Sequence, residues 1–432
     1  MSVTAWLAIA IFAVAYAFIA TEKIHRVAAA LGGAALMLVI GATDAEHAFF
    51  SEEAGIDWNV IFLLLGMMLI VAVLRRTGVF EFVAIWAAKR ARGHPYRLMV
   101  ILVLVTAVAS AFLDNVTTVL LVAPVTFLVC DRLGVPVAPF LIAEALASNI
   151  GGASTLVGDP PNIIIASRSG LSYNDFIVHL APIVVLLLLA FLGLCRWLFR
   201  DAFRYDPQRA ASVMALRERD AITDVRLLVV SLTVLGLVTV AFVLHTVLHL
   251  EPSVVAIVGG LVLLAASRLD AGEVARDVEW PTLAFFAGLF VMVGALVSTG
   301  VIDRVAQAAT DAVEGRLLLA SMVLLWGSAA LSAIVDNIPY VATMSPVVAE
   351  LVQADYGGQD PQVLWWSLAL GADLGGNATA IGASANVVVL GIAERAGRRI
   401  SFWEFTKYGL VVTVITVALC MPYLWLRYFA FA

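Results

Sequence analysis

The chain alternates long apolar stretches with short polar segments. Apolar stretches of about 20 residues are long enough to cross the hydrocarbon core of a bilayer. Such stretches predict membrane spans over residues 3–20, 25–43, 58–74, 176–199, 227–248, 253–267, 281–298 and 405–426. The pattern therefore predicts an all-α polytopic membrane protein.

Two apolar stretches are too long for one helix, and each is interrupted by a carboxylate-amide pair. Residues 98–130 contain Asp114-Asn115, and residues 317–353 contain Asp336-Asn337. An ionisable residue inside a membrane segment indicates a functional site. We expect each stretch to form a re-entrant hairpin with its tip near the middle of the membrane.

Two further apolar stretches contain glycine pairs followed by polar residues. One begins near Pro139 and continues past Gly151-Gly152, and the other covers residues 362–395 with Gly375-Gly376. Irregular backbone at membrane depth is tolerated only where it is buried in protein or lines a wet cavity. The sequence therefore predicts two broken helices at the midplane, with the four glycines as the breaks.

These features recur in order along the chain. The segment Ser110–Thr118 returns as Ser332–Tyr340, and Trp58–Ala84 aligns without gaps on Trp280–Ala306. The repeat predicts a first half over 1–199, a polar linker over 200–226 and a second half over 227–432. Because each half has five transmembrane helices plus one hairpin, an odd number of spans, the two halves should be inverted repeats.

Composition and charge agree with this class. Of the 432 residues, 62% are hydrophobic and 13% are charged, against about 25% charged in soluble domains. If both termini lie outside, 22 of the 26 Lys and Arg residues face the cytoplasm, as the positive-inside rule requires. The exceptions are Arg168, Arg304, Arg316 and Arg427. We expect a multi-pass inner (plasma) membrane protein without nucleic-acid partners, since basic tracts are absent.

The hairpin tips and the helix breaks concentrate polar side chains. Half-helix termini there offer free N–H and C=O groups. The predicted substrate- or ion-binding residues are Asp114, Asn115, Thr117, Thr118, Asn149, Ser154, Thr155, Asp159, Asn162, Asp336, Asn337, Asp373, Asn377, Thr379 and Asn386. Such an oxygen-rich set suits a Na⁺ ion or a small neutral oxyacid.

Proton coupling is expected from carboxylates in these segments. Glu144 lies about one helical turn before Asn149 and, together with Asp114 and Asp336, is a candidate proton carrier. No Lys or Arg stands near the motifs within the predicted spans, which argues against multivalent anions as substrates. We expect H⁺ or Na⁺ as the coupling ion and no other cofactor.

Cysteine and histidine chemistry finds little support. Cys130, Cys195 and Cys420 are far apart in sequence and form no CxxC pair. The pair His245 and His249 has zinc-helix spacing but lacks the glutamate of that motif. We predict no metal centre beyond Na⁺ at the broken helices and no enzyme activity, because no activated nucleophile dyad appears.

The segments Ser110–Thr118 and Ser148–Asn162 resemble the ArsB/NhaD permease family, which belongs to the ion transporter superfamily with the citrate and dicarboxylate carriers. The resemblance covers nearly the whole chain. It implies a scaffold part and a transport part, often a dimer, and alternating access by an elevator-like movement. It also implies that the hairpin tips and broken helices hold substrate and ion. The second tip departs from the first, with Pro339-Tyr340 in place of Thr117-Thr118.

The leading hypothesis is a secondary active transporter that couples protons to the efflux of arsenite and antimonite as neutral trihydroxy acids. A Na⁺/H⁺ antiporter using the same carboxylates is the runner-up, and a Na⁺-coupled organic-anion carrier is the third reading. Inverted repeats with broken helices are typical of secondary transporters and disfavour a channel. The expected partners are a small inorganic solute, membrane lipid, a second copy of the chain and a cytoplasmic ATPase subunit.

Overall fold

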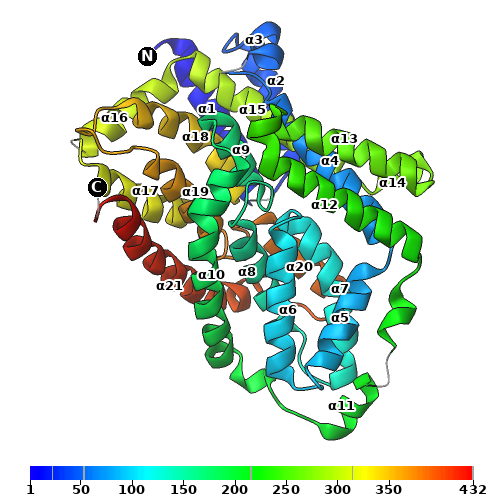
Figure 1. Cartoon of the computed structure of the whole chain (residues 1–432). Helices are drawn as coiled ribbons and strands as arrows, with labels where there is room; N and C mark the ends of the chain where they lie inside the picture. Colours follow the sequence, from blue (N-terminus) through cyan, green and yellow to red (C-terminus); the bar gives the residue numbers. More distant parts are fainter. Residues whose placement is uncertain (22, 52–53, 215–216, 314, 431–432) are drawn as a thin grey trace.

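The computed structural model describes residues 1–21, 23–51, 54–214, 217–313 and 315–430. The predicted linker and second half therefore include positions outside the described residues, namely 215–216, 314 and 431–432. Within the described ranges the chain is helical throughout and contains no strand (Figure 1). Among the described residues, seven helices are long and apolar enough to cross a membrane. The prediction of an all-α polytopic membrane protein is confirmed.

The helices before residue 200 follow the predicted order closely. They are α1 (Val3–Thr21), α2 (Arg26–Val39), α3 (Ala45–Phe50), α4 (Trp58–Arg75), α5 (Val79–Arg90), α6 (Pro95–Ser110), α7 (Asn115–Leu133), α8 (Ala138–Gly152), α9 (Pro160–Ser169) and α10 (Tyr173–Leu198). Helices α6 and α7 form the first hairpin, and α8 with α9 forms the first broken helix. The short helix α3 was not predicted.

The second part of the chain repeats this series. Its helices are α12 (Val225–Leu248), α13 (Pro252–Ser267), α14 (Ala271–Arg276), α15 (Trp280–Ser298), α16 (Val301–Val313), α17 (Leu317–Ser332), α18 (Asn337–Gln353), α19 (Val363–Gly375), α20 (Ser384–Arg395) and α21 (Phe402–Tyr428). Helices α17 and α18 form the second hairpin, and α19 with α20 forms the second broken helix. The orientation of the two series across the membrane stays a prediction.

Contacts between the two series are reciprocal. Helix α4 packs along α13, and α2 packs along α15; likewise α9 lies against α18, and α20 lies against α7. At the α4–α13 contact a Cβ on Gly66 would meet the backbone carbonyl carbon of Ala256 at 2.3 Å, so only glycine allows this approach. Each broken helix therefore completes its packing on the hairpin of the other series.

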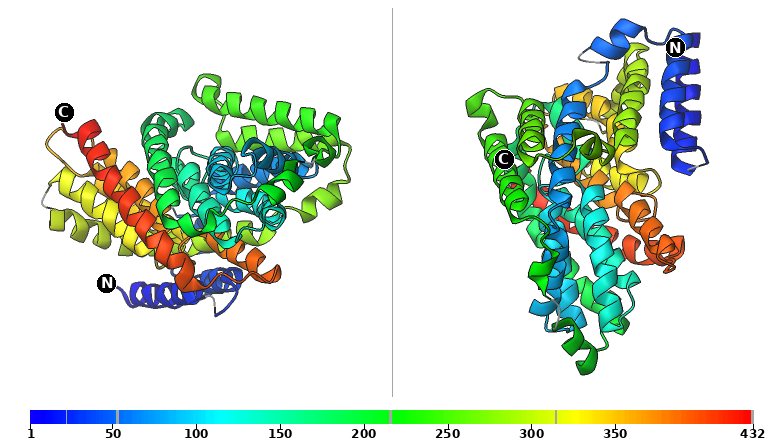
Figure 2. Two further views of the ribbon diagram at one scale, coloured as in Figure 1. Left: turned by 90° about the horizontal axis from the view of Figure 1, so that it is seen from below. Right: turned by 90° about the vertical axis from the view of Figure 1, so that its right-hand side faces the viewer.

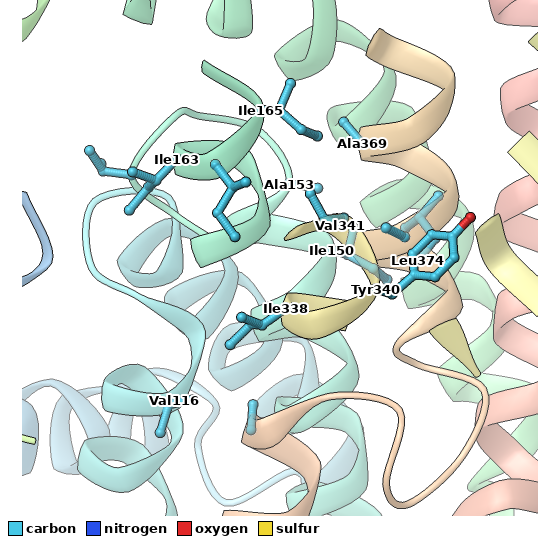
Figure 3. Packing of buried hydrophobic residues seen from close by; sticks show 14 of the residues in the cluster. Val116, Ile150, Ala153, Ile163, Ile165, Ile338, Tyr340, Val341, Ala369 and Leu374 are labelled. Atoms are coloured by element: carbon cyan, nitrogen blue, oxygen red, sulfur yellow. The ribbon is translucent and has the colours of Figure 1, made fainter. Parts of the chain in front are cut away.

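Buried apolar side chains fill the centre of this arrangement. Figure 3 shows Ile338 and Val341 of α18 among Ile163 of α9 and Ile150 of α8, all of them buried. Helix α1 lies along the outside, away from the segment that joins the two series (Figure 2). The apolar packing holds the ends of the half-helices in place, and these ends carry the polar residues described below.

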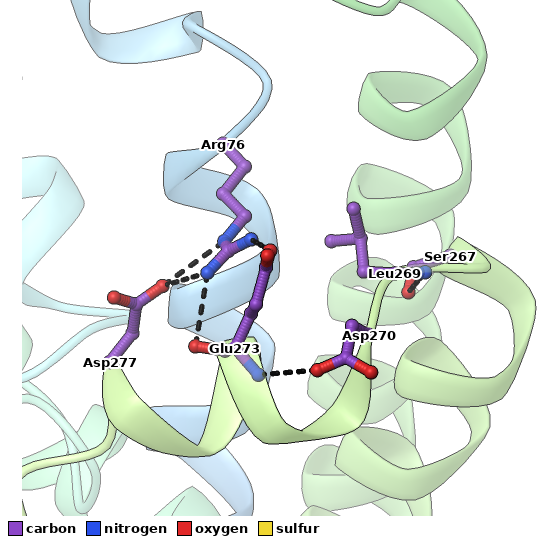
Figure 4. A network of polar contacts seen from close by, with 6 residues as sticks. All are labelled: Arg76, Ser267, Leu269, Asp270, Glu273 and Asp277. Atoms are coloured by element: carbon purple, nitrogen blue, oxygen red, sulfur yellow. Dashed lines mark hydrogen bonds and ion pairs between the residues drawn. The ribbon is translucent and has the colours of Figure 1, made fainter.

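Polar contacts join the two series at one end of α4. Arg76 donates from Nη1 to Glu273 Oε2 of α14 at 2.9 Å and from Nη2 to Oδ2 of Asp277, the residue after α14, at 2.8 Å (Figure 4). Asp270 caps α14 by accepting a hydrogen bond from the backbone N–H of Glu273 at 3.0 Å. Helix α14, which was also not predicted, is thus bonded to the C-terminal end of α4 through Arg76.

The segment between the series is docked, not extended. It contains η1 (Arg200–Ala202), α11 (Pro207–Met214) and η2 (Glu218–Ala221). Lys89 of α5 donates to Glu218 Oε2 at 2.5 Å, and this hydrogen bond lowers the pKa of the Glu218 carboxyl. The Thr223 backbone N–H donates to the Thr77 carbonyl at 3.0 Å.

Candidate functional site

Each broken helix is attached to the tip of its own hairpin by hydroxyl groups. Ser110 Oγ donates to the Ser148 carbonyl at 2.7 Å, and Thr155 Oγ1 donates to the Ala111 carbonyl at 2.6 Å. The second half repeats both bonds, from Ser332 Oγ to the Ala372 carbonyl at 2.7 Å and from Thr379 Oγ1 to the Ala333 carbonyl at 2.6 Å. Thr155 and Thr379, predicted to bind substrate, therefore hold the backbone together.

The glycines predicted as helix breaks lie at the ends of α8 and α19. Helix α8 continues through Gly151 and Gly152, and the irregular segment begins only at Ala153. A Cβ on Gly151 would lie 2.2 Å from the Ala107 carbonyl oxygen of α6. The glycine is thus required by the close approach of α6, and Gly375 meets Ala329 of α17 in the same way, with 2.6 Å to its carbonyl oxygen. Gly376 follows the last residue of α19.

The hairpin carboxylates cap the helices that follow them. Asp114 accepts hydrogen bonds from the Thr117 backbone N–H at 2.8 Å and from Thr117 Oγ1 at 2.5 Å. Asp336 accepts one from the Ile338 backbone N–H at 3.1 Å. Such caps satisfy N–H groups that have no partner within the helix. Ser154 also bonds locally, because its Oγ donates to the Gly151 carbonyl at 2.6 Å.

Asp159 lies where the two hairpins and the first broken helix meet. Asn115 Nδ2 of the first hairpin donates to Asp159 Oδ2 at 3.0 Å and to Asn149 Oδ1 at 2.9 Å. Asn337 of the second hairpin lies 3.4 Å from both carboxyl oxygens of Asp159. Asp159 occupies the N-cap position of α9, but its side chain makes no capping hydrogen bond. The Asp159 side chain is fully buried, and its polar contacts are with the side-chain amides of Asn115 and Asn337.

Further amides connect the two broken helices to each other. Asn149 Nδ2 donates to Asn377 Oδ1 at 2.9 Å and approaches Asn386 Oδ1 at 3.3 Å. Asn386 in turn donates to the Thr379 carbonyl at 2.9 Å, as its counterpart Asn162 donates to the Thr155 carbonyl at 3.0 Å. The residues predicted from two distant motifs thus form one continuous buried network.

Several buried oxygen atoms in and beside this network have no hydrogen-bond donor among the described residues. They are both carboxyl oxygens of Asp373, Oδ1 of Asn162, Oδ1 of Asn337 and the hydroxyl oxygen of Thr118. Asp373 lies within electrostatic range of Asp159, and Asn162 is its polar neighbour. A buried carboxylate without a partner is costly. The site therefore requires a proton, a cation or a donor-rich solute.

Glu144 lies apart from the amide network, on the side of α8 that faces α7. Thr126 Oγ1 donates to Glu144 Oε1 at 2.5 Å, whereas Oε2 has no partner among the described residues. The side chain is 1% exposed. Glu144 Oε2 is therefore available to bind a proton while Oε1 keeps its hydrogen bond to Thr126. The role of Glu144 in proton coupling stays a prediction.

One basic side chain reaches a hairpin tip, contrary to the prediction that no Lys or Arg stands near the motifs. Arg26, the first residue of α2, donates from Nη1 to Ser384 Oγ at 2.6 Å and lies 4.0 Å from Asp336 Oδ2. Ser384 Oγ donates to Asp336 Oδ2 at 2.5 Å. These residues line a cavity of about 310 Å³ beside the second hairpin.

Sequence reasoning missed Arg26 and Ser384 for a definite reason. Arg26 stands at the start of a predicted span, where a basic residue is typical of a cytoplasmic flank, and its partner Asp336 belongs to the other half of the chain. Ser384 heads α20 at the position where Pro160 heads α9. The repeat alignment could have indicated Ser384, but nothing in the sequence indicated its contact with Arg26.

Cys130, Cys195 and Cys420 are buried and unpaired. In the described ranges, no group of three His, Cys, Asp or Glu side chains is arranged to hold a metal ion.

Residues 16–371 match the CitMHS family, described as citrate transporter. An uncharacterized transporter of Mycobacterium tuberculosis, Rv2685, is 57% identical over 98% of this chain and 99% of its own length. The human P protein is 34% identical over 97% of this chain, which spans 59% of that longer protein.

A solved structure shares the fold. The YdaH transporter of Alcanivorax borkumensis covers 84% of this chain and 84% of its own, with a TM-score of 0.58 and 16% sequence identity. At this identity the likeness extends to the fold alone.

Proposed function

The chain belongs to the citrate transporter (CitMHS) family of the ion transporter superfamily, and we propose that it is a proton-coupled secondary transporter that exports arsenite and antimonite as neutral trihydroxy acids. Its role as a multi-pass membrane transporter follows from its relatives. The proposal also includes the coupling ion, the substrate and the ArsB/NhaD relationship. It further includes the plasma-membrane location with both termini outside, and pairing with a second copy or an ATPase subunit.

The observation that carries the proposal is the set of buried oxygen atoms without donors. Asp373, Asn162 and Asn337 together present four such oxygens. A trihydroxy acid is uncharged and brings three O–H donors, so it can satisfy several of these acceptors at once. A buried acceptor left without a donor costs about 1–3 kcal/mol. The match in hydrogen-bonding type therefore favours a donor-rich neutral solute.

Two buried carboxyl groups of the site are candidates to carry the coupled proton. Asp159 and Asp373 are two buried carboxyl groups in one site, and no Lys or Arg among the described residues bonds to either. Ionising both without a counter-ion is unfavourable. A proton on one of them reduces the charge of the pair from −2 to −1 when the solute leaves, which links solute movement to proton movement in the opposite direction.

Two other cargoes remain as outcomes of the test. Na⁺ is favoured by the same carboxylate and amide oxygens, because hard cations prefer oxygen ligands. An organic anion is favoured by Arg26 beside Asp336 and by the description of the family as citrate transporter. A polycarboxylate, however, brings further acceptors to a site that already lacks donors.

The alternating-access step would move the hairpins and broken helices relative to the α2, α4, α13 and α15 group. Arg26 is then a contact between the two groups, because α2 carries the guanidinium while Asp336 and Ser384 stand at the starts of α18 and α20.

Everted membrane vesicles with an acidic lumen test the proposal. We expect accumulation of arsenite that stops when the pH gradient is dissipated, and no accumulation in vesicles that carry Asp373→Asn. Parallel vesicles receive radioactive Na⁺ or citrate. Proton-driven uptake of Na⁺ without arsenite would identify an antiporter, and uptake of citrate without arsenite would identify an organic-anion carrier; either result overturns the proposal.

A further inference from the structure

A long apolar groove lies on the surface between α5, α6, α10 and α12. Its volume is about 1,090 Å³, which exceeds the roughly 300–1,000 Å³ of ordinary small-molecule pockets. The walls include Leu104, Val108 and Phe112 on the α6 side and Leu232 on α12, all of them exposed. The groove thus runs between the first hairpin and a helix of the second series.

The length of the groove follows from the helix that forms its wall. Arg97 and Val108 both line it and stand three turns apart on α6. At 1.5 Å per residue this distance is roughly 16 Å. Half of the hydrocarbon core of a bilayer is about 15 Å thick. From its Arg97 end to Val108, the groove therefore has about the length of one leaflet.

One end of the groove is basic. Arg90, at the end of α5, and Arg97, at the start of α6, both line it and are exposed. Arg97 also lines an adjoining cavity of about 440 Å³ together with Arg196 and Arg200. No carboxylate of the described residues lies within 4.0 Å of Arg90, Arg97 or Arg196. Arg97 thus belongs to both hollows and stands between Arg90 in the groove and Arg196 in the adjoining cavity, and none of the three has an acidic partner among the described residues.

Aromatic side chains lie beside the basic end of the groove. Trp86 lies one turn before Arg90 on α5, lines the groove and is 43% exposed. The ring of Tyr96 lies under the Arg196 guanidinium, 4.9 Å from centroid to Cζ. Exposed Trp and Tyr are typical of the level of the lipid headgroups.

We propose that the groove is a binding site for an anionic phospholipid, with the acyl chains along Leu104 and Val108 and the phosphate between Arg90, Arg97 and Arg196. Basic pockets on the cytoplasmic side of transmembrane helices bind anionic headgroups, and that leaflet carries the negative lipids. The predicted topology places this end of α5 and α6 on the cytoplasmic side. A free phosphate would use the arginines but leave the apolar groove unexplained.

The lipid would also affect movement of the hairpin. The acyl chains contact α6 on one side and α12 on the other, so a change in their relative position changes the shape of the groove. We expect the transport rate to depend on the charge of the lipid, and not only on the presence of a bilayer.

The test measures lipids retained by the purified full-length protein after exchange into detergent from vesicles of equal phosphatidylglycerol and phosphatidylcholine. We expect the wild type to retain phosphatidylglycerol with roughly tenfold preference. The variant Arg90→Gln/Arg97→Gln/Arg196→Gln should lose the preference. The matched control Arg395→Gln/Arg399→Gln, with two exposed arginines outside the groove, should keep it.

A second variant tests the apolar part independently. Val108→Trp fills the groove without changing charge and should reduce retention of both lipids. Equal retention of the two lipids by the wild type, an unchanged preference in the triple variant, or displacement of the lipid by millimolar glycerol phosphate alone would each overturn the proposal. The last result would indicate a simple anion site.

Discussion

The Arg26 guanidinium lies 4.0 Å from the Asp336 carboxylate, and Ser384 bonds to both. The contact connects the start of α2 with the tip of the second hairpin. It gives the second hairpin a positive neighbour that the first hairpin lacks in the same position, since Pro252 occupies the first position of α13.

Arg26→Gln should separate the candidate cargoes. A neutral trihydroxy acid has no charge for the guanidinium to attract, so its KM in proteoliposomes should change by less than about threefold. An organic anion that uses Arg26 should lose more than about tenfold in affinity. A large rise in the KM for arsenite would contradict the assignment of a neutral substrate; Arg398→Gln, an exposed arginine paired with Asp131, is the control.

The two central aspartates should respond differently to loss of charge. Asp373 has no donor in strict hydrogen-bond geometry among the described residues, although Asn162 is its polar neighbour, so Asp373→Asn removes a costly carboxyl and should leave thermal stability equal or higher while transport is lost. Asp159 accepts from Asn115 and lies next to Asn337. In Asp159→Asn an added NH₂ group opposes one of these donors, which should cost about 1–3 kcal/mol.

Thermal unfolding in detergent, read by size-exclusion fluorescence, compares the two aspartate variants. Equal losses of stability would show that Asp373 has a partner equivalent to those of Asp159. Wild-type transport in Asp373→Asn would remove this residue from proton coupling.

Glu144→Gln should uncouple transport from the pH gradient. Glutamine resembles the protonated carboxyl and can still accept the hydrogen bond from Thr126. The variant should exchange substrate across proteoliposomes but not accumulate it when the pH is changed on one side. Thr126→Val, which removes the hydrogen bond but keeps the carboxyl, is the matched comparison. If Glu144→Gln still accumulates substrate, Glu144 has no part in the coupling, and the proton is carried by Asp114, Asp159, Asp336 or Asp373 alone.

Gly151→Ala should prevent close packing of the first hairpin. The added Cβ would lie 2.2 Å from the Ala107 carbonyl oxygen, a backbone atom that cannot rotate away. Overpacking of this kind costs about 1–3 kcal/mol. Gly193→Ala in α10, where no atom lies within 4 Å, is the control and should be neutral or stabilising. Unfolding temperatures of the purified variants decide; equal values would show that α6 can shift.

The topology can be checked by cysteine labelling. We expect Gln208→Cys, an exposed position in the docked segment, to react with an impermeant maleimide only from the cytoplasmic side, because that arrangement places 22 of 26 basic residues there. The background is Cys130→Ala/Cys195→Ala/Cys420→Ala, which should transport normally since the three thiols lie outside the amide network. Labelling only from outside would reverse the topology.

The sequence predicts the fold well where one residue type decides the local structure. Asp114 and Asp336 in apolar surroundings indicated the hairpins, and Pro160 after a polar segment indicated the start of α9. The repeat then supplied the second half by comparison with the first. The short helices α3 and α14 were not predicted, because a helix of six residues is too short to show a hydrophobic periodicity in the sequence.

The sequence predicted that the asparagines lie together, but not which atoms the neighbouring hydroxyl groups contact. The asparagines of the two motifs do form one network, yet Thr155 and Thr379 bond to hairpin carbonyls. A hydroxyl in a polar motif has the same appearance in the sequence whether it faces a solute or a neighbouring backbone. Arg26 shows the other limit, because its contact with Asp336 depends on how the two series pack, which no local pattern encodes.

The reciprocal packing of the broken helices has a consequence for biogenesis. Helix α9 ends at Ser169 and finds its partner on α18, which begins only at Asn337. At a translation rate of about 5–20 residues per second, α9 waits roughly 8–34 s for that partner. During this interval Asp159 and Asn162 belong to a half-helix too short to span the bilayer. The nascent first half must therefore be sheltered beside the insertion machinery until the second half emerges from the ribosome.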